Sequence, residues 1–325
     1  MYVVGLDIGY SNLKVVYGEA GKSPEAHVMP AAAAPASHVS EMVLGAGSGA
    51  DEEIVQVDGE PWVAGVPPRK IEGYVREIHH DYAMTDTYRA LMLAGIGSTN
   101  AEKIDHLVTG LPVSHFRDEA KRQALKSMLR GTHTVSGGRE VVVSDVSVIP
   151  QPVGSYMSIV STFEDAELLE EGRVLVIDPG YFSVDWLTIE AMEARMASSG
   201  TSLKAMSKLL EQAAVILERE HGPGVTPEAI ENALRVGKDR VFHFGSRIDI
   251  TTALDQAAES NAKIALSALT SSMREDAASI DVVVLCGGGA KLYEKAAREV
   301  FERSRIIVPE SPVLSNARGF FFFGL

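Results

Sequence analysis

Cysteine is almost absent from this sequence, because Cys286 is the single example in 325 residues. One thiol cannot form an internal disulfide, so buried apolar side chains have to hold the fold together, and such usage fits a reducing compartment. Long apolar runs are absent too, and none approaches the ~20 residues of a membrane span. The chain opens directly on strand-like residues, so we expect no signal peptide. We therefore predict a cytoplasmic protein with no membrane partner.

Basic residues are also few. The sequence has 30 Lys and Arg against 44 Asp and Glu, which gives a formal net charge of −14. Binding to nucleic-acid phosphates requires clustered cations, and here they are scattered. This argues against direct nucleic-acid binding, so any action on DNA would need a basic partner protein. The 46% apolar and 23% charged fractions are ordinary for a soluble globular protein, and the length favours two domains.

The most informative stretch is Val174–Thr188, which reads VLVIDPGYFSVDWLT. A short run of Val, Leu and Ile is typical of a strand buried on both faces. A tight turn at Asp178–Gly180 and a second strand from about Val184 follow. An Asp at a strand end beside a Gly offers a carboxylate and backbone N–H groups at one point. This combination suits a phosphate with magnesium, because the amides bind oxygens while the Asp orients the hydrated metal.

The stretch Val3–Val16, VVGLDIGYSNLKVV, repeats this pattern. Asp7 aligns with Asp178, and the register continues until Lys14 aligns with Asp185. A lone Asp-x-Gly triplet commonly marks no more than a turn. Two copies at matched register indicate an internal repeat, and such a repeat decides the architecture. We predict two similar halves that face each other with a nucleotide between them.

Other residues near these turns could bind phosphate. Lys14 lies at an alternating strand position from which it could reach a β- or γ-phosphate; the alternative is a solvent-facing lysine on an edge strand. Asn12 adds a further donor. The segment Cys286–Lys291, CGGGAK, is predicted to join a strand to a helix. Its glycines allow the backbone to approach a ligand and the helix N-terminus favours an anion; the alternative is a plain turn.

Gln151 stands between two prolines at the predicted end of a strand. A side-chain amide both donates and accepts hydrogen bonds, so it can orient a water nucleophile without being a strong base. Taken alone, Gln151 is more simply interpreted as a loop residue. The functional interpretation depends on its position in the chain between the twin motifs.

Strands alternate with helices along the rest of the chain, which predicts an α/β fold. Residues 20–50, rich in Ala, Gly, Ser and Pro, are predicted to be mostly loop. Asp58–Gly59 is a two-residue hairpin signal, and Thr85 is the predicted N-cap of a helix. A single amphipathic helix is predicted from Phe116 to Leu129.

Together these motifs resemble the actin, heat-shock chaperone and sugar-kinase ATPase superfamily. The resemblance spans nearly the whole chain. It implies a first phosphate motif at Asp7–Lys14 and a second at Asp178–Asp185, with an adenosine motif at Leu285–Lys291. It also implies a first connecting segment at 151–160 and a second at Ser315–Gly319. Within the superfamily the sequence is similar to the ParM/StbA type of prokaryotic actin-like protein, including its short archaeal relatives. Thr109–Val113 and Asn316–Gly319 carry part of this second resemblance.

The implied fold is α/β, the actin-like (ribonuclease H-like) duplicated two-domain fold with an interdomain nucleotide cleft. We expect residues 1–158, with 312–325 returning to them, to form domain I and residues 159–311 to form domain II. The large chaperones carry an additional peptide-binding domain that 325 residues cannot hold. Sugar kinases need a catalytic Asp near a sugar pocket and are usually longer.

The resemblance also implies cofactors and site residues. Gln151, Asp178 and Asp7 are the expected catalytic residues, and the two aspartates are expected to hold Mg²⁺ through water. The expected ATP contacts come from all three motifs: Gly9, Tyr10, Ser11, Asn12, Lys14, Gly180, Tyr181, Phe182, Ser183, Gly287, Gly288, Gly289 and Lys291.

The sequence departs from the family pattern in two places. Pro179, Tyr181 and Phe182 stand where relatives often carry small or hydroxyl residues, so the γ-phosphate contacts are expected to differ. Gln151 stands where the segregation actins commonly have Glu, which resembles the eukaryotic actin arrangement instead. We expect hydrolysis to be slow.

The implied function is that of an ATPase that polymerises into filaments and segregates plasmids or other DNA through a separate DNA-binding adaptor. Two alternatives from other classes remain. One is a monomeric phosphotransferase or polyphosphatase that uses the same site, and the other is a non-polymerising scaffold that binds nucleotide as a switch. Light scattering with and without ATP separates the first function from the alternatives.

Overall fold

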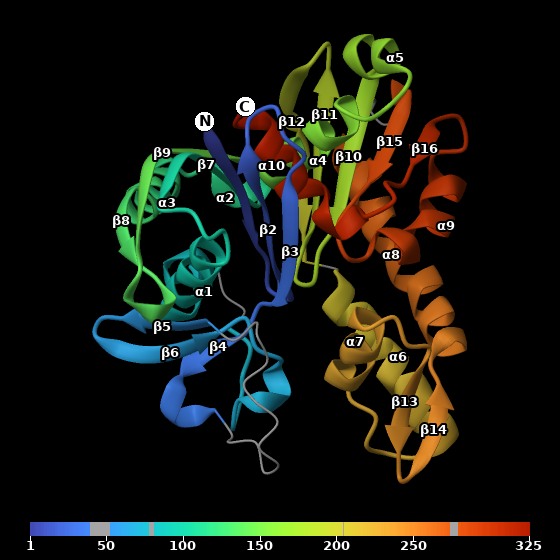
Figure 1. Ribbon diagram of the computed structural model, residues 1–325. Coiled ribbons are helices and arrows are strands. Elements are labelled where there is room, and N and C mark those ends of the chain that lie inside the picture. The colour runs from blue at the N-terminus through green and yellow to red at the C-terminus, as the bar shows by residue number, and fades with distance from the viewer. Residues whose placement is uncertain (40–52, 78–80, 204, 274–278) are drawn as a thin grey trace. The chain divides into compact units, whose positions relative to one another are not determined.

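The computed structural model describes residues 1–39, 53–77, 81–203, 205–273 and 279–325 (Figure 1). The chain forms two compact units. Unit 1 comprises Met1–Glu164 and Val313–Leu325, and unit 2 comprises Asp165–Pro312. The division falls a few residues after 158, because the helix Gln151–Val160 (α4) packs within unit 1. Each unit has a mixed sheet and its own apolar core.

Unit 1 has a six-stranded sheet in the order β3-β2-β1-β7-β9-β8 and a three-stranded sheet in the order β4-β6-β5. Strands β1, β7 and β9 run parallel, while β2, β3 and β8 join antiparallel. Its strands are β1 Tyr2–Ile8, β2 Asn12–Glu19, β3 Glu25–Pro30, β4 Ala33–Pro35, β5 Glu53–Val57, β6 Glu60–Ala64, β7 Lys103–Leu111, β8 Gly131–Thr134 and β9 Glu140–Pro150. Its helices are α1 Asp86–Gly97, α2 Val113–Phe116, α3 Glu119–Leu129, α4 and α10 Ser315–Phe323.

Unit 2 has a five-stranded sheet in the order β12-β11-β10-β15-β16 and a hairpin of β13 and β14. Its strands are β10 Arg173–Pro179, β11 Val184–Glu190, β12 Glu193–Ser202, β13 Arg240–His243, β14 Ser246–Asp249, β15 Val282–Leu285 and β16 Arg305–Ile307. Its helices are α5 Ala166–Glu171, α6 Met206–His221, α7 Pro227–Arg235, α8 Thr251–Met273 and α9 Ala290–Val300. Cys286 follows β15 and is completely buried. Among the described residues we find no helix with the length and hydropathy of a membrane span.

Several local predictions are confirmed. The Asp58–Gly59 turn joins β5 to β6, with positive φ at both residues, as a tight two-residue hairpin requires. Thr85 caps α1, because its side-chain oxygen accepts a hydrogen bond from the backbone N–H of Tyr88. The matched repeat produces two hairpins with the same register, in which Asp7 lies opposite Lys14 and Asp178 lies opposite Asp185.

Two local predictions need correction. The helix predicted from about Phe116 to Leu129 is present as α3, but it begins at Glu119, because the side chain of Asp118 caps its first turn, and the short helix α2 precedes it. The segment predicted as loop at 20–50 contains β3 and β4; residues 40–50 of that prediction lie outside the described part of the chain. Strand β3 escapes the sequence pattern because it is mostly exposed and shows little apolar alternation.

The last helix, α10, lies against β1 and α4 at backbone contact distance (Figure 1). A Cβ on Gly319 would lie 1.5 Å from the carbonyl oxygen of Gly154, and a Cβ on Gly5 would lie 2.1 Å from that of Ala317. Only glycine permits such an approach. A buried hydrogen bond from Ser155 Oγ to Asn316 Oδ1, 2.6 Å long, fixes the register of the two helices. The C-terminal helix is therefore part of the core of unit 1.

Replacing Gly319 with Ala is expected to push α10 off α4 and to destabilise unit 1 by about 1–3 kcal/mol or more, the usual range for overpacking a core. Urea unfolding followed by circular dichroism measures the effect. Gly288→Ala is the matched control, because a Cβ there meets no atom within 4 Å. Equal midpoints for the two variants would show that the close packing of α10 contributes nothing to stability.

Candidate functional site

The turn after β1 is closed by its own backbone. The N–H of Gly9 donates to the carbonyl of Asn12 over 3.0 Å, which reverses the chain directly after the buried strand. The carbonyl of Ser11 accepts from the N–H of Ala31, also within unit 1. The turn that carries the first predicted phosphate contacts is thereby held in one place.

Asp7 is the centre of a polar cluster in unit 1. Its side chain is 1% exposed and that of Lys14 is 13% exposed, and Lys14 Nζ lies 2.8 Å from Asp7 Oδ2. Gln151 Nε2 donates to the other oxygen, Oδ1, over 3.0 Å. Gln151 is the first residue of α4, so one carboxylate joins the first hairpin to the start of that helix. Three residues predicted separately from the sequence are brought together here.

Gly110 also belongs to this cluster, although the sequence alone does not indicate it. A Cβ at position 110 would lie 2.8 Å from Cγ of Gln151 and 2.4 Å from the ring of Phe320. The glycine therefore leaves the room that Gln151 needs to reach Asp7. A glycine near the end of a predicted strand is a sequence signal for close packing. The residues that it packs against, Gln151 and Phe320, are distant in the chain, so the sequence does not identify them.

Tyr10 takes a position that the sequence did not predict. Its ring stacks on Tyr82 with centroids 4.5 Å apart, and Tyr82 meets the buried Tyr88 edge to face. Burial raises the pKa of both Tyr82 and Tyr88 above the ordinary tyrosine value, so both stay neutral. The ring of Tyr10 thus packs within unit 1, which leaves the backbone of the turn as the part suited to phosphate contact.

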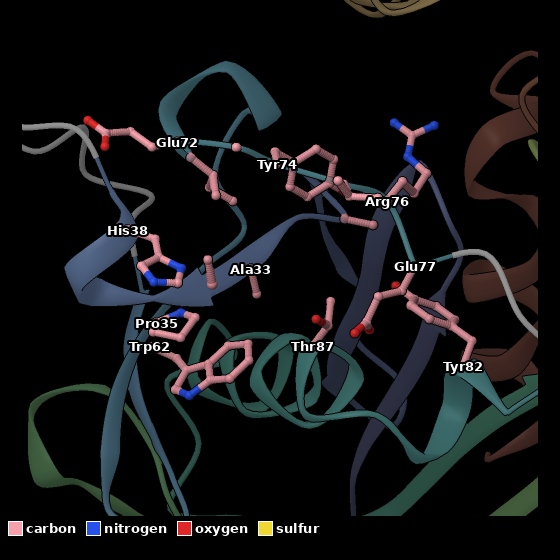
Figure 2. Close-up of a pocket in the computed structure, with 15 residues that line it drawn as sticks. Ala33, Pro35, His38, Trp62, Glu72, Tyr74, Arg76, Glu77, Tyr82 and Thr87 are labelled. Atoms are coloured by element: carbon pink, nitrogen blue, oxygen red, sulfur yellow. The ribbon is translucent and has the colours of Figure 1, made fainter.

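Tyr82 also lines a pocket of about 240 Å³ in unit 1 (Figure 2). Trp62, Thr87 and Tyr82 lie along one side in the view, and Tyr74 lies across from them. The tyrosine stack therefore connects this pocket to the turn after β1.

The turn after β10 in unit 2 repeats the first one with different chemistry. The N–H of Gly180 donates to the carbonyl of Ser183 over 2.8 Å. Asp178 and Asp185 are both buried and lie opposite each other on β10 and β11. Asp185 accepts from Ser183 Oγ at 2.7 Å and from Thr201 Oγ1 at 2.6 Å. In unit 1 the carboxylate of Asp7 pairs with the ammonium group of Lys14, whereas in unit 2 two carboxylates occupy the matching cross-strand positions.

The three glycines after β15 have three different environments. Gly287 has φ +74°, and a Cβ there would lie 2.0 Å from Asp178 Oδ1. A Cβ on Gly289 would lie 2.8 Å from both Met206 Sδ and the carbonyl oxygen of Pro179. Both positions thus require glycine so that the turn after β10 can pack against the start of α9. Gly288 meets nothing within 4 Å and is exposed, so its backbone is open to a ligand.

The other residues predicted to contact ATP in unit 2 differ in how far they are buried. Tyr181 packs at the edge of the core of unit 2. Phe182 is partly exposed beside it in the turn, and Lys291 is exposed on the first turn of α9. The described residues contain no group of three or more His, Cys, Asp or Glu side chains arranged to hold a metal ion.

Two family models match the chain, one after the other. The model for the N-terminal domain of actin-like proteins matches residues 5–154, and that for the C-terminal region of archaeal actin homologues of the MreB-like type matches residues 176–299. The chain belongs to the prokaryotic actin-like proteins. A search of curated proteins found no match. The first match contains the Asp7 cluster, and the second contains the Asp178 turn and the three glycines.

Solved actin-like structures share this fold over the whole chain. The archaeal actin homolog Ta0583 in complex with ADP is 20% identical, with 98% of each chain covered and a TM-score of 0.76. A 15-stranded ParM filament from Clostridium botulinum is 18% identical, with 99% of this chain and 98% of that chain covered and a TM-score of 0.79. Bacillus thuringiensis ParM with ATP is 16% identical, with coverage of 100% and 98% and a TM-score of 0.64. The chain therefore has the actin-like two-domain fold.

Lys14→Met is expected to destabilise unit 1 by about 3 kcal/mol, because it leaves the buried Asp7 carboxylate without its cation. The double variant Asp7→Asn, Lys14→Met is expected to recover most of that loss, since the neutral amide still accepts the hydrogen bond from Gln151. Urea unfolding of both variants measures the difference. If the single and double variants were equally stable, the ion pair would not be a structural element of the hairpin.

Proposed function

We propose that this actin-like protein is an ATPase that binds ATP with Mg²⁺ through the turns after β1, β10 and β15 and assembles into filaments. The observation that carries the proposal is the Asp7 cluster, in which Gln151 is held at a strand end by a buried carboxylate. The open backbone at Gly288 supports it from unit 2. Relatives of the same fold bound to ADP and ATP support the choice of ligand.

The residues present fit a hydrated magnesium ion. Asp7 already accepts from Lys14 and Gln151, so it suits contact through water rather than direct coordination. Asp178 and Asp185 bring two carboxylates to one face of unit 2, and carboxylate oxygens are the donors that magnesium prefers. Bound Mg²⁺ would offset the negative charge of the phosphates. Asp7 and Asp178 are the residues that we assign to its waters.

Gln151 is the residue that we assign to the attacking water. Its amide nitrogen donates to Asp7, which fixes the orientation of the amide. The amide oxygen is then left as the hydrogen-bond acceptor. An amide oxygen can accept a hydrogen bond from a water and align it without removing its proton. This role predicts hydrolysis that is slow but specific to the aligned water.

Assembly and its use in the cell complete the proposal. A ParM relative forms a 15-stranded filament, and another is described as a non-polymerisable mutant, which supports polymerisation as the shared property. With a net charge of −14, contact with DNA would pass through a separate basic adaptor. We therefore propose filament-driven segregation of a plasmid or other DNA in the cytoplasm.

Gln151→Ala is expected to slow ATP turnover by roughly 10²-fold or more with little change in nucleotide affinity, because positioning a water acts mainly on the transition state. Steady-state phosphate release and equilibrium nucleotide binding measure the two quantities. Gln123→Ala on α3, where the glutamine donates to the exposed Glu119, is the matched control. If nucleotide affinity fell as much as turnover, Gln151 would instead contribute to binding ATP in the ground state.

ATP with Mg²⁺ is expected to convert the wild-type chain into sedimentable polymer above a critical concentration. Nucleotide shifts this equilibrium only if it binds the assembled state more tightly than the free state. Because the proposal has ATP bound together with Mg²⁺, removal of Mg²⁺ by chelation should reverse the increase in light scattering. Asp178→Ala, which removes the carboxylate beside Gly287, should abolish the response. A chain that hydrolyses ATP yet stays monomeric would point to the phosphotransferase alternative.

A further inference from the structure

Exposed apolar side chains concentrate in one short segment of unit 2. Leu234, Val236, Phe242 and Phe244 are all exposed, and the two phenylalanines are 74% and 83% exposed. They lie at the end of α7 and on the hairpin Arg240–Asp249, which we call the Phe hairpin. Clustered apolar exposure of this kind marks interaction surfaces.

Both phenylalanines lie largely outside the core of unit 2. Along the hairpin, Val241 and Ile248 are buried in the core of unit 2 and supply its inward face. Phe242 lies opposite Arg247 on the outward face, with the guanidinium 5.6 Å from the ring centroid. Phe244 is at the turn with φ 44°, a conformation that favours Asn or Gly over an aromatic residue. Phe244 also lies against the ring of His243, with centroids 4.3 Å apart, yet most of both phenylalanine side chains is left exposed.

A complementary surface lies at the other end of the same unit. Asp165–Glu171, which we call the acidic segment, has four carboxylates in seven residues. It precedes β10 at the end of unit 2 opposite the Phe hairpin (Figure 1). Glu167, Glu170 and Glu171 are exposed and form no ion pair among the described residues. On the hairpin side, Lys238 and Arg247 likewise form none within the described chain.

We propose that the Phe hairpin of one molecule docks on the acidic segment of a second copy of this chain. The phenylalanines supply the apolar centre of the contact, and Lys238 and Arg247 meet the glutamates around it. Since the two surfaces lie at opposite ends of unit 2, the contact is head to tail. Repeated without closure, it produces an open filament. The inference rests on the proposed polymerisation and names the surface that carries it.

Two loss variants test the contact. The hairpin variant is Phe242→Thr, Phe244→Asn, in which Thr keeps the strand and Asn suits the positive φ. The acidic variant is Glu167→Lys, Glu170→Lys, Glu171→Lys. Each is expected to raise the critical concentration at least about tenfold, as loss of a buried aromatic or charged anchor does. The control is Val28→Thr, Val142→Thr, which alters exposed apolar positions on strands of unit 1 and should leave assembly unchanged.

Mixing the two loss variants decides whether the contact is head to tail. The hairpin variant keeps its acidic segment and the acidic variant keeps its hairpin, so one intact contact remains possible in the mixture. Sedimentation velocity with ATP and Mg²⁺ should show each variant alone as a monomer and the mixture as a one-to-one dimer that does not grow. Unchanged melting temperature and nucleotide affinity of each variant show that its fold is intact.

The outcomes separate this inference from the proposed function. Wild-type polymer together with normal polymerisation of the hairpin variant overturns the docking surface and leaves the filament function standing. A mixture that contains only monomers overturns it as well. A wild-type chain that binds ATP without sedimenting overturns the filament function, and the dimer in the mixture, which needs a single contact, then still decides the docking surface.

Discussion

The close approach of α10 to β1 and α4 is the constraint on which unit 1 depends. Gly5, Gly154 and Gly319 remove the side chains that would hold these elements apart, and Ser155 and Asn316 fix the helices in register. This packing sets the position of the N-terminus of α4 and therefore of Gln151. The hydrogen bond from Gln151 to Asp7 is a consequence of how three backbones meet, and Gly110 gives the side chain its path.

The two halves of the chain repeat a backbone pattern and diverge in charge. The same cross-strand position holds Lys14 in unit 1 and Asp185 in unit 2. A neutralised carboxylate in one unit can anchor a polar side chain, as Asp7 anchors Gln151. A pair of carboxylates in the other unit favours a cation instead, while the hydroxyls of Ser183 and Thr201 hold Asp185 in place. One structural repeat thus holds an ion pair in unit 1 and two facing carboxylates in unit 2.

Local signals were enough to predict much of this structure. The Asp-x-Gly hairpins, the Asp58–Gly59 turn and the Thr85 cap each depend on a few adjacent residues, and resemblance to known motifs supplied the fold. The contacts that the sequence did not predict join residues that are distant in the chain. The contact between Gln151 and Asp7 spans 144 positions, and the stacking of Tyr10 on Tyr82 joins the first hairpin to the short helix Tyr82–Met84, far along the chain. Strand β12, rich in Ser, Ala and Gly, has no apolar alternation and is specified by its pairing with β11.

The return of residues 313–325 to unit 1 has a consequence for how the chain folds as it is made. Unit 2 is continuous in sequence from Asp165 to Pro312, so all of its strands leave the ribosome before α10 does. Unit 1 begins first but lacks α10 until residues 315–323 emerge, and without that helix Val3 and Val16 lose the packing of Ala317 and Phe321 against them. Domains generally fold as units during synthesis. Unit 2, which is translated second, is therefore able to finish folding first, and unit 1 has to wait for α10.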